Sequence, residues 1–269
     1  MKNKVGVVTS TYPNFNAEEA LEGISEAGFK YVELASAPSY FEHILPRPEE
    51  RVDKESVDGV LNMVNKYGLT MYCVAGHTRL MKENCVDNFK KVLDFAGMAG
   101  VNYVTTDTGE VKTKEDEEKF YTDIKEIADY AKSKNVIVCL EMHGNWCNTG
   151  KKGAEIIETI NHSNIRLNYD TGNVIFYGNK KPEEDIKYAL PYMAFLHLKE
   201  DGSGKFQDWN FPALGEGIID FKKVFNLIKD YAGPISVEIE FDGKKRSLEE
   251  VNKAVKKSYD FLKGFGYVQ

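Results

Sequence analysis

Apolar and polar positions repeat with two different periods along this chain. Short runs rich in β-branched residues predict eight strands, at residues 5–10, 30–36, 70–76, 102–108, 136–144, 165–172, 193–199 and 234–240. Longer segments place apolar residues three or four positions apart, which is typical of helices with one buried face, at 16–29, 83–100, 115–135 and 220–233. Gly28, Gly68 and Gly100 each stand one apolar residue ahead of a strand. Glycine favours the left-handed conformation that ends helices, so these junctions predict short helix-to-strand turns.

This alternation of strands and helices predicts the fold. Nearly continuous apolar strands separated by helices indicate a parallel sheet covered by helices. Eight such units in about 250 residues favour a closed (β/α)8 TIM barrel, an α/β fold. An open doubly wound sheet is the alternative, but VTSTYPN follows the first strand where a glycine-rich nucleotide loop would stand. We see no linker or low-complexity stretch and expect residues 1–269 to form a single domain.

Composition and charge narrow the range of partners. The formal net charge is -7 and no basic block of the kind that nucleic-acid-binding proteins carry is present, so a nucleic-acid partner is not expected. No stretch approaches 18 apolar residues, which argues against a membrane span. The four cysteines form no CxxC pair, which favours a reducing compartment. The first residues do not resemble a secretory signal, and we expect a cytoplasmic protein.

Metal-binding residue types end four consecutive predicted strands. Glu141 ends the fifth strand, Asp170 the sixth, His197 the seventh, and Glu238 with Glu240 the eighth. Neighbouring strands lie about 4.8 Å apart, so side chains at equivalent heights can converge in the barrel mouth. One carboxylate at a strand end is often a helix cap or a solvated loop residue. Four on successive buried strands are better explained by a shared cation, because burying unpaired charges costs several kcal/mol.

The donor types narrow the choice of metal. Three carboxylates and one imidazole make a mixed oxygen and nitrogen set. Such a set suits Mn²⁺, Co²⁺ or Mg²⁺, and Zn²⁺ is less favoured without thiolates. We expect a divalent metal cofactor, with manganese first among these.

Several motifs resemble one known superfamily. They are LEMHGN (140–145), LNYDTGN (167–173), HLKEDG (197–202), ALGEGIIDF (213–221) and GPISVEIE (233–240). Together, across nearly the whole chain, they resemble the xylose isomerase-like TIM barrels, which include sugar-phosphate isomerases/epimerases, ketose 3-epimerases and inosose dehydratases. The resemblance implies four metal ligands, Glu141, Asp170, His197 and Glu238. Glu240 shares the inward face and is the alternative ligand or a group that supports one.

One position departs from the pattern of the ketose 3-epimerases. Their motif resembles D-x-x-H after the sixth strand, and this chain has DTGN with Asn173 in place of the histidine. Assignment to that particular activity is therefore weakened. Endonuclease IV, another member, carries a larger histidine-rich zinc set, and this acidic chain with five histidines does not resemble it.

The resemblance implies an isomerase or epimerase of carbohydrate metabolism that removes a proton next to a carbonyl through a metal-bound enediolate. A divalent ion on two neighbouring oxygens acidifies that proton, and Glu141 with Glu238 would remove and return it from opposite faces. Epimerisation, isomerisation and dehydration all remain open. The alternative is a metal-dependent lyase or dehydratase on an oxidised sugar, an inosose-like cyclitol or a keto-glycoside. A sugar-binding protein with a vestigial site is a third, non-enzymatic hypothesis.

Other polar residues near strand ends are candidate contacts for a small carbohydrate substrate. We single out His143, Lys199, Asn173, His77, Glu33 and Trp209. A rim histidine and a surface lysine are the plainer interpretations of His143 and Lys199. The loops after the second and seventh strands predict a lid and an aromatic wall, and equally suit an interface in a homo-oligomer. No phosphate-binding cluster is evident, so a free sugar fits as well as a sugar phosphate.

Overall fold

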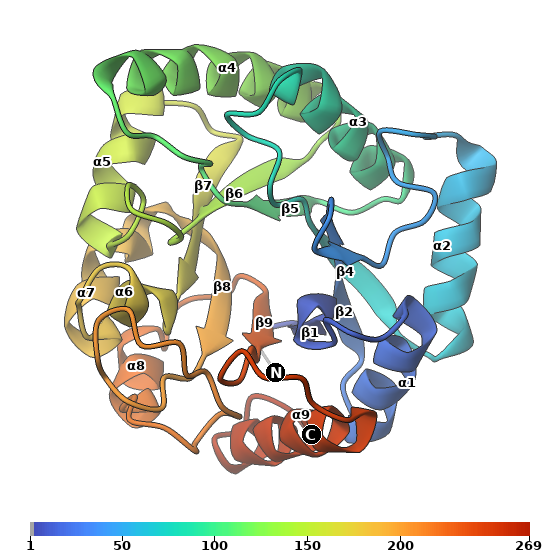
Figure 1. The fold of residues 1–269 in the computed structure, drawn as a ribbon, viewed down its shortest axis with the longest axis vertical. Coiled ribbons are helices and arrows are strands. Elements are labelled where there is room, and N and C mark those ends of the chain that lie inside the picture. The colour runs from blue at the N-terminus through green and yellow to red at the C-terminus, as the bar shows by residue number, and fades with distance from the viewer. Residues whose placement is uncertain (1–2) are drawn as a thin grey trace.

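Eight parallel strands close into a barrel in the computed structural model, which describes residues 3–269 (Figure 1). The hydrogen-bonded order is β1-β9-β8-β7-β6-β5-β4-β2, and a further pairing of β1 with β2 closes the ring. A two-residue strand, β3, pairs antiparallel with the end of β2. The predicted (β/α)8 barrel is therefore confirmed.

The strands are short and each is followed by helical structure. They are β1 (Val5–Val8), β2 (Tyr31–Ala37), β3 (Phe41–Glu42), β4 (Thr70–Ala75), β5 (Tyr103–Thr106), β6 (Ile137–Glu141), β7 (Ile165–Asp170), β8 (Met193–Lys199) and β9 (Ile235–Glu238). The helices are α1 (Ala17–Ala27), α2 (Lys54–Lys66), α3 (Cys85–Met98), α4 (Lys114–Ser133), α5 (Gly150–Ile160), α6 (Asn173–Phe176), α7 (Pro182–Ala189), α8 (Phe221–Leu227) and α9 (Leu248–Gly264). The helix expected over 220–233 ends at Leu227, and a turn through Ile228 and Tyr231 leads to β9.

Local signals in the sequence set the ends of the helices. Asn16, Asp53, Thr113 and Ser247 each begin a helix with a capping box, in which the side chain and the third helical residue satisfy each other's backbone N–H groups. Gly28 ends α1 with a φ of 111°, which confirms the predicted glycine turn before β2. This turn is short, so β2 begins three residues after Gly28, at Tyr31.

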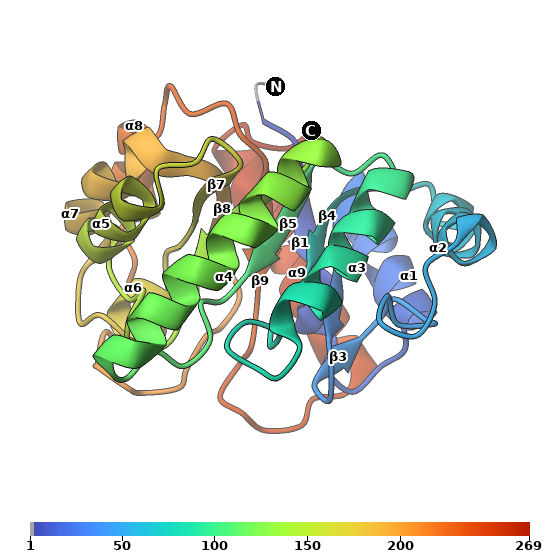
Figure 2. The same ribbon diagram turned by 90° about the horizontal axis from the view of Figure 1, so that it is seen from above.

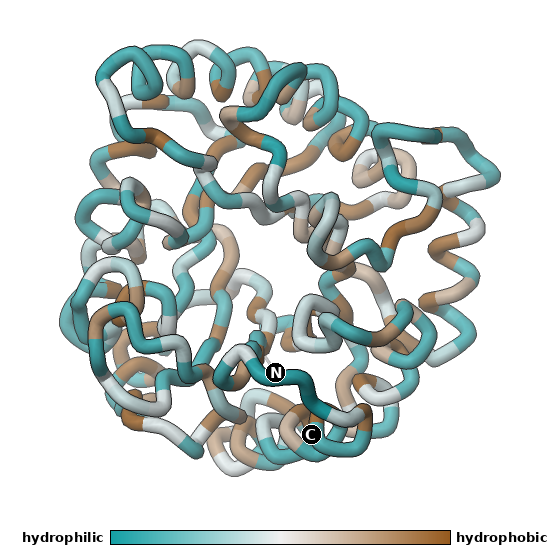
Figure 3. The backbone as a smooth tube through the Cα atoms, viewed as in Figure 1, coloured by the Kyte–Doolittle hydropathy of each residue, from teal (hydrophilic) through white to brown (hydrophobic). Residues whose placement is uncertain are grey.

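Two apolar layers hold the barrel together. The larger lies between the strands and the surrounding helices, and Figure 3 shows its hydrophobic segments on the strands and on the sides of the helices that face them. A smaller cluster of Tyr72, Cys73, Cys139 and Phe195 fills the interior. These residues precede the polar strand ends along β4, β6 and β8, so the polar side chains lie above an apolar plug.

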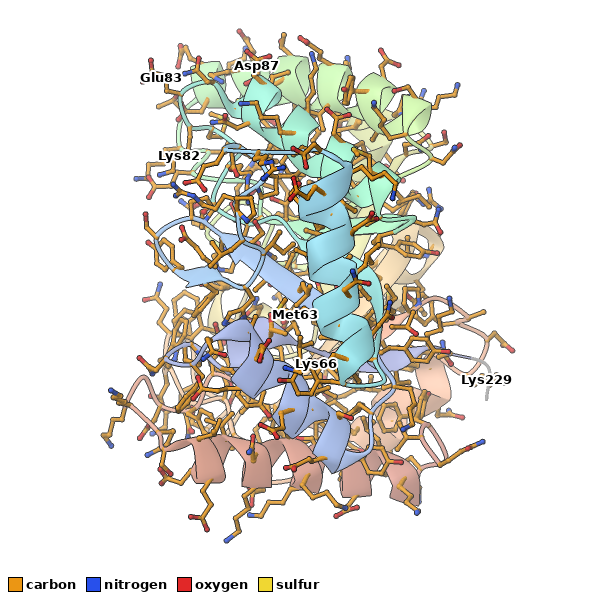
Figure 4. All side chains as sticks on the ribbon, turned by 90° about the vertical axis from the view of Figure 1, so that its right-hand side faces the viewer. Met63, Lys66, Lys82, Glu83, Asp87 and Lys229 are labelled. Carbon is orange, nitrogen blue, oxygen red and sulfur yellow. The ribbon has the colours of Figure 1, made fainter. Side chains whose placement is uncertain are left out.

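The carboxyl ends of the strands face one end of the barrel. Figure 2 shows β3, which follows the end of β2, on the side opposite the C-terminus. The outer surface is polar, and exposed ion pairs link neighbouring helices, such as Lys66 on α2 with Glu18 on α1 at 3.0 Å (Figure 4). Within residues 3–269, no helix has the length and apolar character needed to cross a membrane.

Candidate metal centre and active site

Four side chains from consecutive strands meet at the centre of the barrel mouth. Glu141, Asp170, His197 and Glu238 are all buried, and one ligand atom from each lies within 4.8 Å of the others. His197 Nδ1 lies 3.2 Å from Glu238 Oε2, 3.6 Å from Glu141 Oε2 and 3.8 Å from Asp170 Oδ2. Parallel pairing puts Asp170 beside His197 and Lys199 beside Glu238, which explains why the strand ends converge. The structure therefore brings together all four predicted ligands.

The hydrogen bonding of this group leaves a place for a cation. Asp170 Oδ2, His197 Nδ1 and Glu238 Oε2 are buried and have no hydrogen-bond partner. Buried polar atoms in proteins are normally hydrogen-bonded, and three unpaired atoms facing one point are costly. A divalent cation would satisfy all three and neutralise the neighbouring carboxylates. The residues thus form a group that could hold a metal ion.

The charged groups of the cluster and their burial shift one another's pKa values. Burial raises the pKa of Asp170 well above its usual value. Burial acts in the same direction on Glu238, but the Lys199 ammonium overrides it and holds the pKa of Glu238 well below its usual value. Burial would lower the pKa of His197, yet the carboxylates of Glu33 and Glu141 raise it well above the ordinary value. A cation at Nδ1 would take the place of a proton there.

Glu33 orients the imidazole from below. His197 Nε2 lies 2.9 Å from Glu33 Oε2, and the same carboxylate accepts hydrogen bonds from Ser236 Oγ at 2.6 Å and Thr105 Oγ1 at 2.5 Å. A carboxylate on the far ring nitrogen fixes which nitrogen faces the metal in many metal sites. Glu33 is fully buried and does not line the cavity described below. The structure thus places this predicted substrate contact behind the ligand, where it supports His197.

Glu141 is held by three donors. His77 Nε2 lies 2.7 Å from Glu141 Oε2, and Asn168 Nδ2 donates to the same oxygen at 3.2 Å. Asn173 Nδ2 donates to Glu141 Oε1 at 2.8 Å. Burial would lower the pKa of His77, but the neighbouring Glu141 carboxylate raises it to about 9. Asn173, predicted as a substrate contact, instead positions a ligand.

Lys199 and Glu240 form a buried pair at the side of the cluster. Lys199 Nζ forms a salt bridge with Glu240, donates to Asn173 Oδ1 at 3.1 Å and lies 3.5 Å from Glu238 Oε2. The ammonium also lies 4.4 Å from the centre of the Phe211 ring. Glu240 is outside the four-residue group, because its carboxylate is engaged by Lys199. Of the two candidates on the last strand, the geometry favours Glu238 as the ligand.

A cavity of about 410 Å³ opens over the four-residue group. This volume suits a small organic molecule. Its walls include the predicted contacts His77, His143, Lys199 and Trp209, and the hairpin of β2 and β3 contributes Tyr40 and Phe41. The cavity thus combines polar groups with aromatic faces, as a sugar requires.

Sequence reasoning missed three residues at this site. Ser10 donates to Glu238 Oε1 at 3.2 Å, and its place at the end of the predicted strand 5–10 was a usable signal. Tyr177 shares a hydrogen bond of 3.0 Å with His143 Nε2, and burial raises the pKa of its phenol. Asp107 lines the cavity and accepts from the backbone N–H groups of Thr78 and Gly109. Asp107 lies at the end of the predicted strand 102–108, so the same signal was available for it, whereas nothing in the sequence marked Tyr177.

Comparison with known proteins identifies the family. Residues 21–265 match the model of the xylose isomerase-like TIM barrel family. The chain belongs to this family. L-ribulose-5-phosphate 3-epimerase UlaE from Escherichia coli strain ATCC 8739 is 22% identical over 258 residues, covering 88% of this chain and 86% of its own.

Two solved structures show the same fold. D-allulose 3-epimerase from Methylomonas sp. superposes with a TM-score of 0.75 at 20% identity, covering 97% of each chain. The probable 3-DHS dehydratase AsbF from Bacillus anthracis gives a TM-score of 0.72 at 14% identity, covering 97% of this chain and 98% of its own. Both superpositions agree with the predicted fold, and the match of residues 21–265 to the family model confirms the predicted family.

Proposed function

We propose that the protein is a divalent-metal-dependent sugar epimerase or isomerase. The observation that carries this proposal is the buried group of Glu141, Asp170, His197 and Glu238, three of which line a cavity of about 410 Å³. The relative UlaE is an L-ribulose-5-phosphate 3-epimerase, which supports the same reaction class.

The two glutamates suit proton transfer at the carbon next to a carbonyl. Glu141 ends β6 and Glu238 ends β9, with β7 and β8 between them, so they approach the cluster from different sides. A divalent cation held by the four side chains would polarise the carbonyl and hydroxyl oxygens of the substrate. Glu238, kept ionised by the neighbouring Lys199 ammonium, accepts the proton as a carboxylate. Glu141 returns a proton to the opposite face, and His77, whose pKa is raised to about 9 and whose Nε2 lies 2.7 Å from Glu141 Oε2, supplies that proton.

Neighbouring residues keep this pair in place and exclude water. Ser10 holds the outer oxygen of Glu238, and Asn173 holds that of Glu141. Tyr40 and Phe41 on the hairpin after β2 form one wall of the cavity, where they limit access of water to the deprotonated substrate.

Solvent hydrogen exchange tests this function. The manganese-loaded protein is incubated in deuterated buffer with L-ribulose 5-phosphate and with L-ribulose, and products are followed by NMR. An epimerase incorporates deuterium at one carbon and forms the epimeric ketose, whereas an isomerase forms an aldose. Glu141→Gln and Glu238→Gln should each lower the rate by about 100-fold or more, since general acid-base catalysis contributes about 10²–10⁴-fold. Absence of exchange with every ketose of a pentose and hexose panel would overturn the proposal.

A lyase is the second candidate, because Asn173 replaces the histidine of the ketose 3-epimerase pattern. A lyase or dehydratase acting on an oxidised sugar, an inosose-like cyclitol or a keto-glycoside would form an enone that absorbs in the ultraviolet. Absorbance with a keto-glycoside or inosose, without epimer formation, would select this alternative.

We further propose manganese as the cation, because three carboxylates and one imidazole suit it, with cobalt, magnesium and zinc as alternatives. We place the protein in the cytoplasm, since all four cysteines are buried free thiols. We take residues 1–269 as one barrel domain, and a homo-oligomer remains a prediction that size-exclusion chromatography with light scattering would test.

A further inference from the structure

A second cavity adjoins the candidate active site. Its volume is about 330 Å³, and it shares the side chains of Ser10, Phe41, Trp209 and Glu240 with the cavity over the metal-binding group. These shared side chains place the two cavities next to each other. The second cavity therefore lies where the far end of a linear substrate would emerge.

The outer wall of this second cavity is basic. Lys244, Lys245 and Arg246 follow β9 in sequence and all line it. Among the described lining residues the one carboxylate is Glu240, which is already paired with Lys199. The wall thus presents three cations to the cavity.

Carboxylates of the same segment offset part of this charge, namely Asp242 and, in the first turn of α9, Glu249 and Glu250. Asp242 lies 2.8 Å from Lys244 Nζ and 2.8 Å from Arg246 Nη2. The hydrogen bond from Lys244 is the main reason that the pKa of Asp242 falls to about 2, so Asp242 carries a full negative charge at neutral pH. Arg246 also lies 5.3 Å from the centre of the Phe241 ring, which helps to fix its guanidinium.

The start of α9 lies beside these cations, and its first turn carries Glu249 and Glu250. Ser247 caps the helix, and the capping box with Glu250 occupies the first backbone N–H groups. A ligand would therefore be bound by the basic side chains of the loop and not by the helix N-terminus, whose dipole the two carboxylates offset.

We propose that the loop of Lys244, Lys245 and Arg246 binds the phosphate of a sugar phosphate whose carbonyl end occupies the metal-binding cavity. This inference rests on the proposed function and names its substrate class. A phosphate monoester offers three acceptor oxygens and about -1.5 to -2 charges at neutral pH to the three basic side chains that line the cavity, whereas the carboxylate of a sugar acid offers two oxygens and one charge. Lysine and arginine are also the usual partners of phosphate oxygens.

The test compares a matched pair of sugars on charge-matched variants. Full-length manganese-loaded protein is assayed for solvent exchange with L-ribulose 5-phosphate and L-ribulose, and kcat/KM for each gives a phosphate preference. Lys244→Ala/Lys245→Ala should lower this preference about tenfold or more, mainly through KM, because charge-assisted hydrogen bonds are lost. The rate with free L-ribulose should stay within about twofold of the original, since neither lysine lines the metal-binding cavity.

The control makes the same change in net charge elsewhere. Lys253→Ala/Lys263→Ala removes two exposed lysines of α9 that line neither cavity, and the phosphate preference should not change. Calorimetric titration of both sugars measures binding independently of turnover. A phosphate preference kept in Lys244→Ala/Lys245→Ala, or lost equally in the control, overturns the phosphate site and leaves the proposed reaction standing. Selective binding of the phosphorylated sugar without exchange overturns the proposed reaction and supports the site.

Discussion

Replacing Glu33 by glutamine should weaken metal binding without touching a ligand. Glu33 is fully buried and accepts from His197 Nε2 at 2.9 Å, from Ser236 Oγ and from Thr105 Oγ1. Glutamine has nearly the same shape, and the hydroxyl of Thr105 can turn to accept from the new amide. Glu33→Gln therefore removes the charge while keeping the hydrogen bonds.

The expected loss of metal affinity follows from replacing a charged hydrogen-bond acceptor by a neutral one. A hydrogen bond to a charged group contributes about 1.5–3 kcal/mol and a neutral one about 0.5–1.5 kcal/mol. The loss of about 1–1.5 kcal/mol at the imidazole corresponds to a metal dissociation constant about tenfold higher. This agrees with the usual effect of partners that orient metal ligands.

Competition of manganese between the protein and a chelating dye measures this constant. Asp185→Asn is the matched control, because Asp185 is also a buried carboxylate that accepts from Gly150 N and Tyr169 Oη but touches none of the four ligands. An unchanged affinity in a folded Glu33→Gln protein would refute the role assigned to Glu33. An equal loss in Asp185→Asn would show that the effect is not local.

Three further predictions follow from single positions. Gly6→Ala should lower the free energy of unfolding by about 1–3 kcal/mol in urea titrations, because its Cβ would lie 2.4 Å from the carbonyl oxygen of Tyr31. An unchanged midpoint would contradict this. Asn173→Ala should lower kcat/KM about 10- to 100-fold, since Glu141 loses a donor at 2.8 Å, and a rate within twofold of the original would argue against this role. Burial lowers the pKa of His43 in the folded protein. The stability that neutral His43 contributes is therefore present above the pKa of histidine in the unfolded chain, about 6.5, and is lost as pH falls below it. The stability difference between the original protein and His43→Gln should therefore shrink from pH 7.5 to 5, and a constant difference would refute it.

The site residues at the strand ends could be predicted from the sequence because the barrel geometry determines where they lie. Once eight strands were recognised, their parallel order placed Glu141, Asp170, His197 and Glu238 at one end, and the structure brings them together. The period of two along a strand left Glu238 and Glu240 as equal candidates. Only the position of Lys199, which pairs with Glu240, separates them.

The sequence could not predict how deep a side chain lies inside the barrel or how a loop folds over the barrel mouth. Glu33 ends no strand, since β2 continues to Ala37, and its height in the barrel decides that it supports a ligand instead of facing the substrate. Lys244, Lys245 and Arg246 are consecutive in the chain, yet no phosphate-binding cluster was evident from the sequence alone. Their relation to the cavity depends on how the loop after β9 folds back over the barrel mouth, which no local pattern encodes.

Metal content tests the central claim most directly. Elemental analysis of the purified protein after incubation with manganese should give close to one divalent ion per chain. His197→Ala and Asp170→Asn should each lose most of it, while Lys253→Ala should keep it, because Lys253 is an exposed residue of α9. Absence of bound metal in the original protein, or equal content in all three variants, would contradict a metal centre built by these four strands.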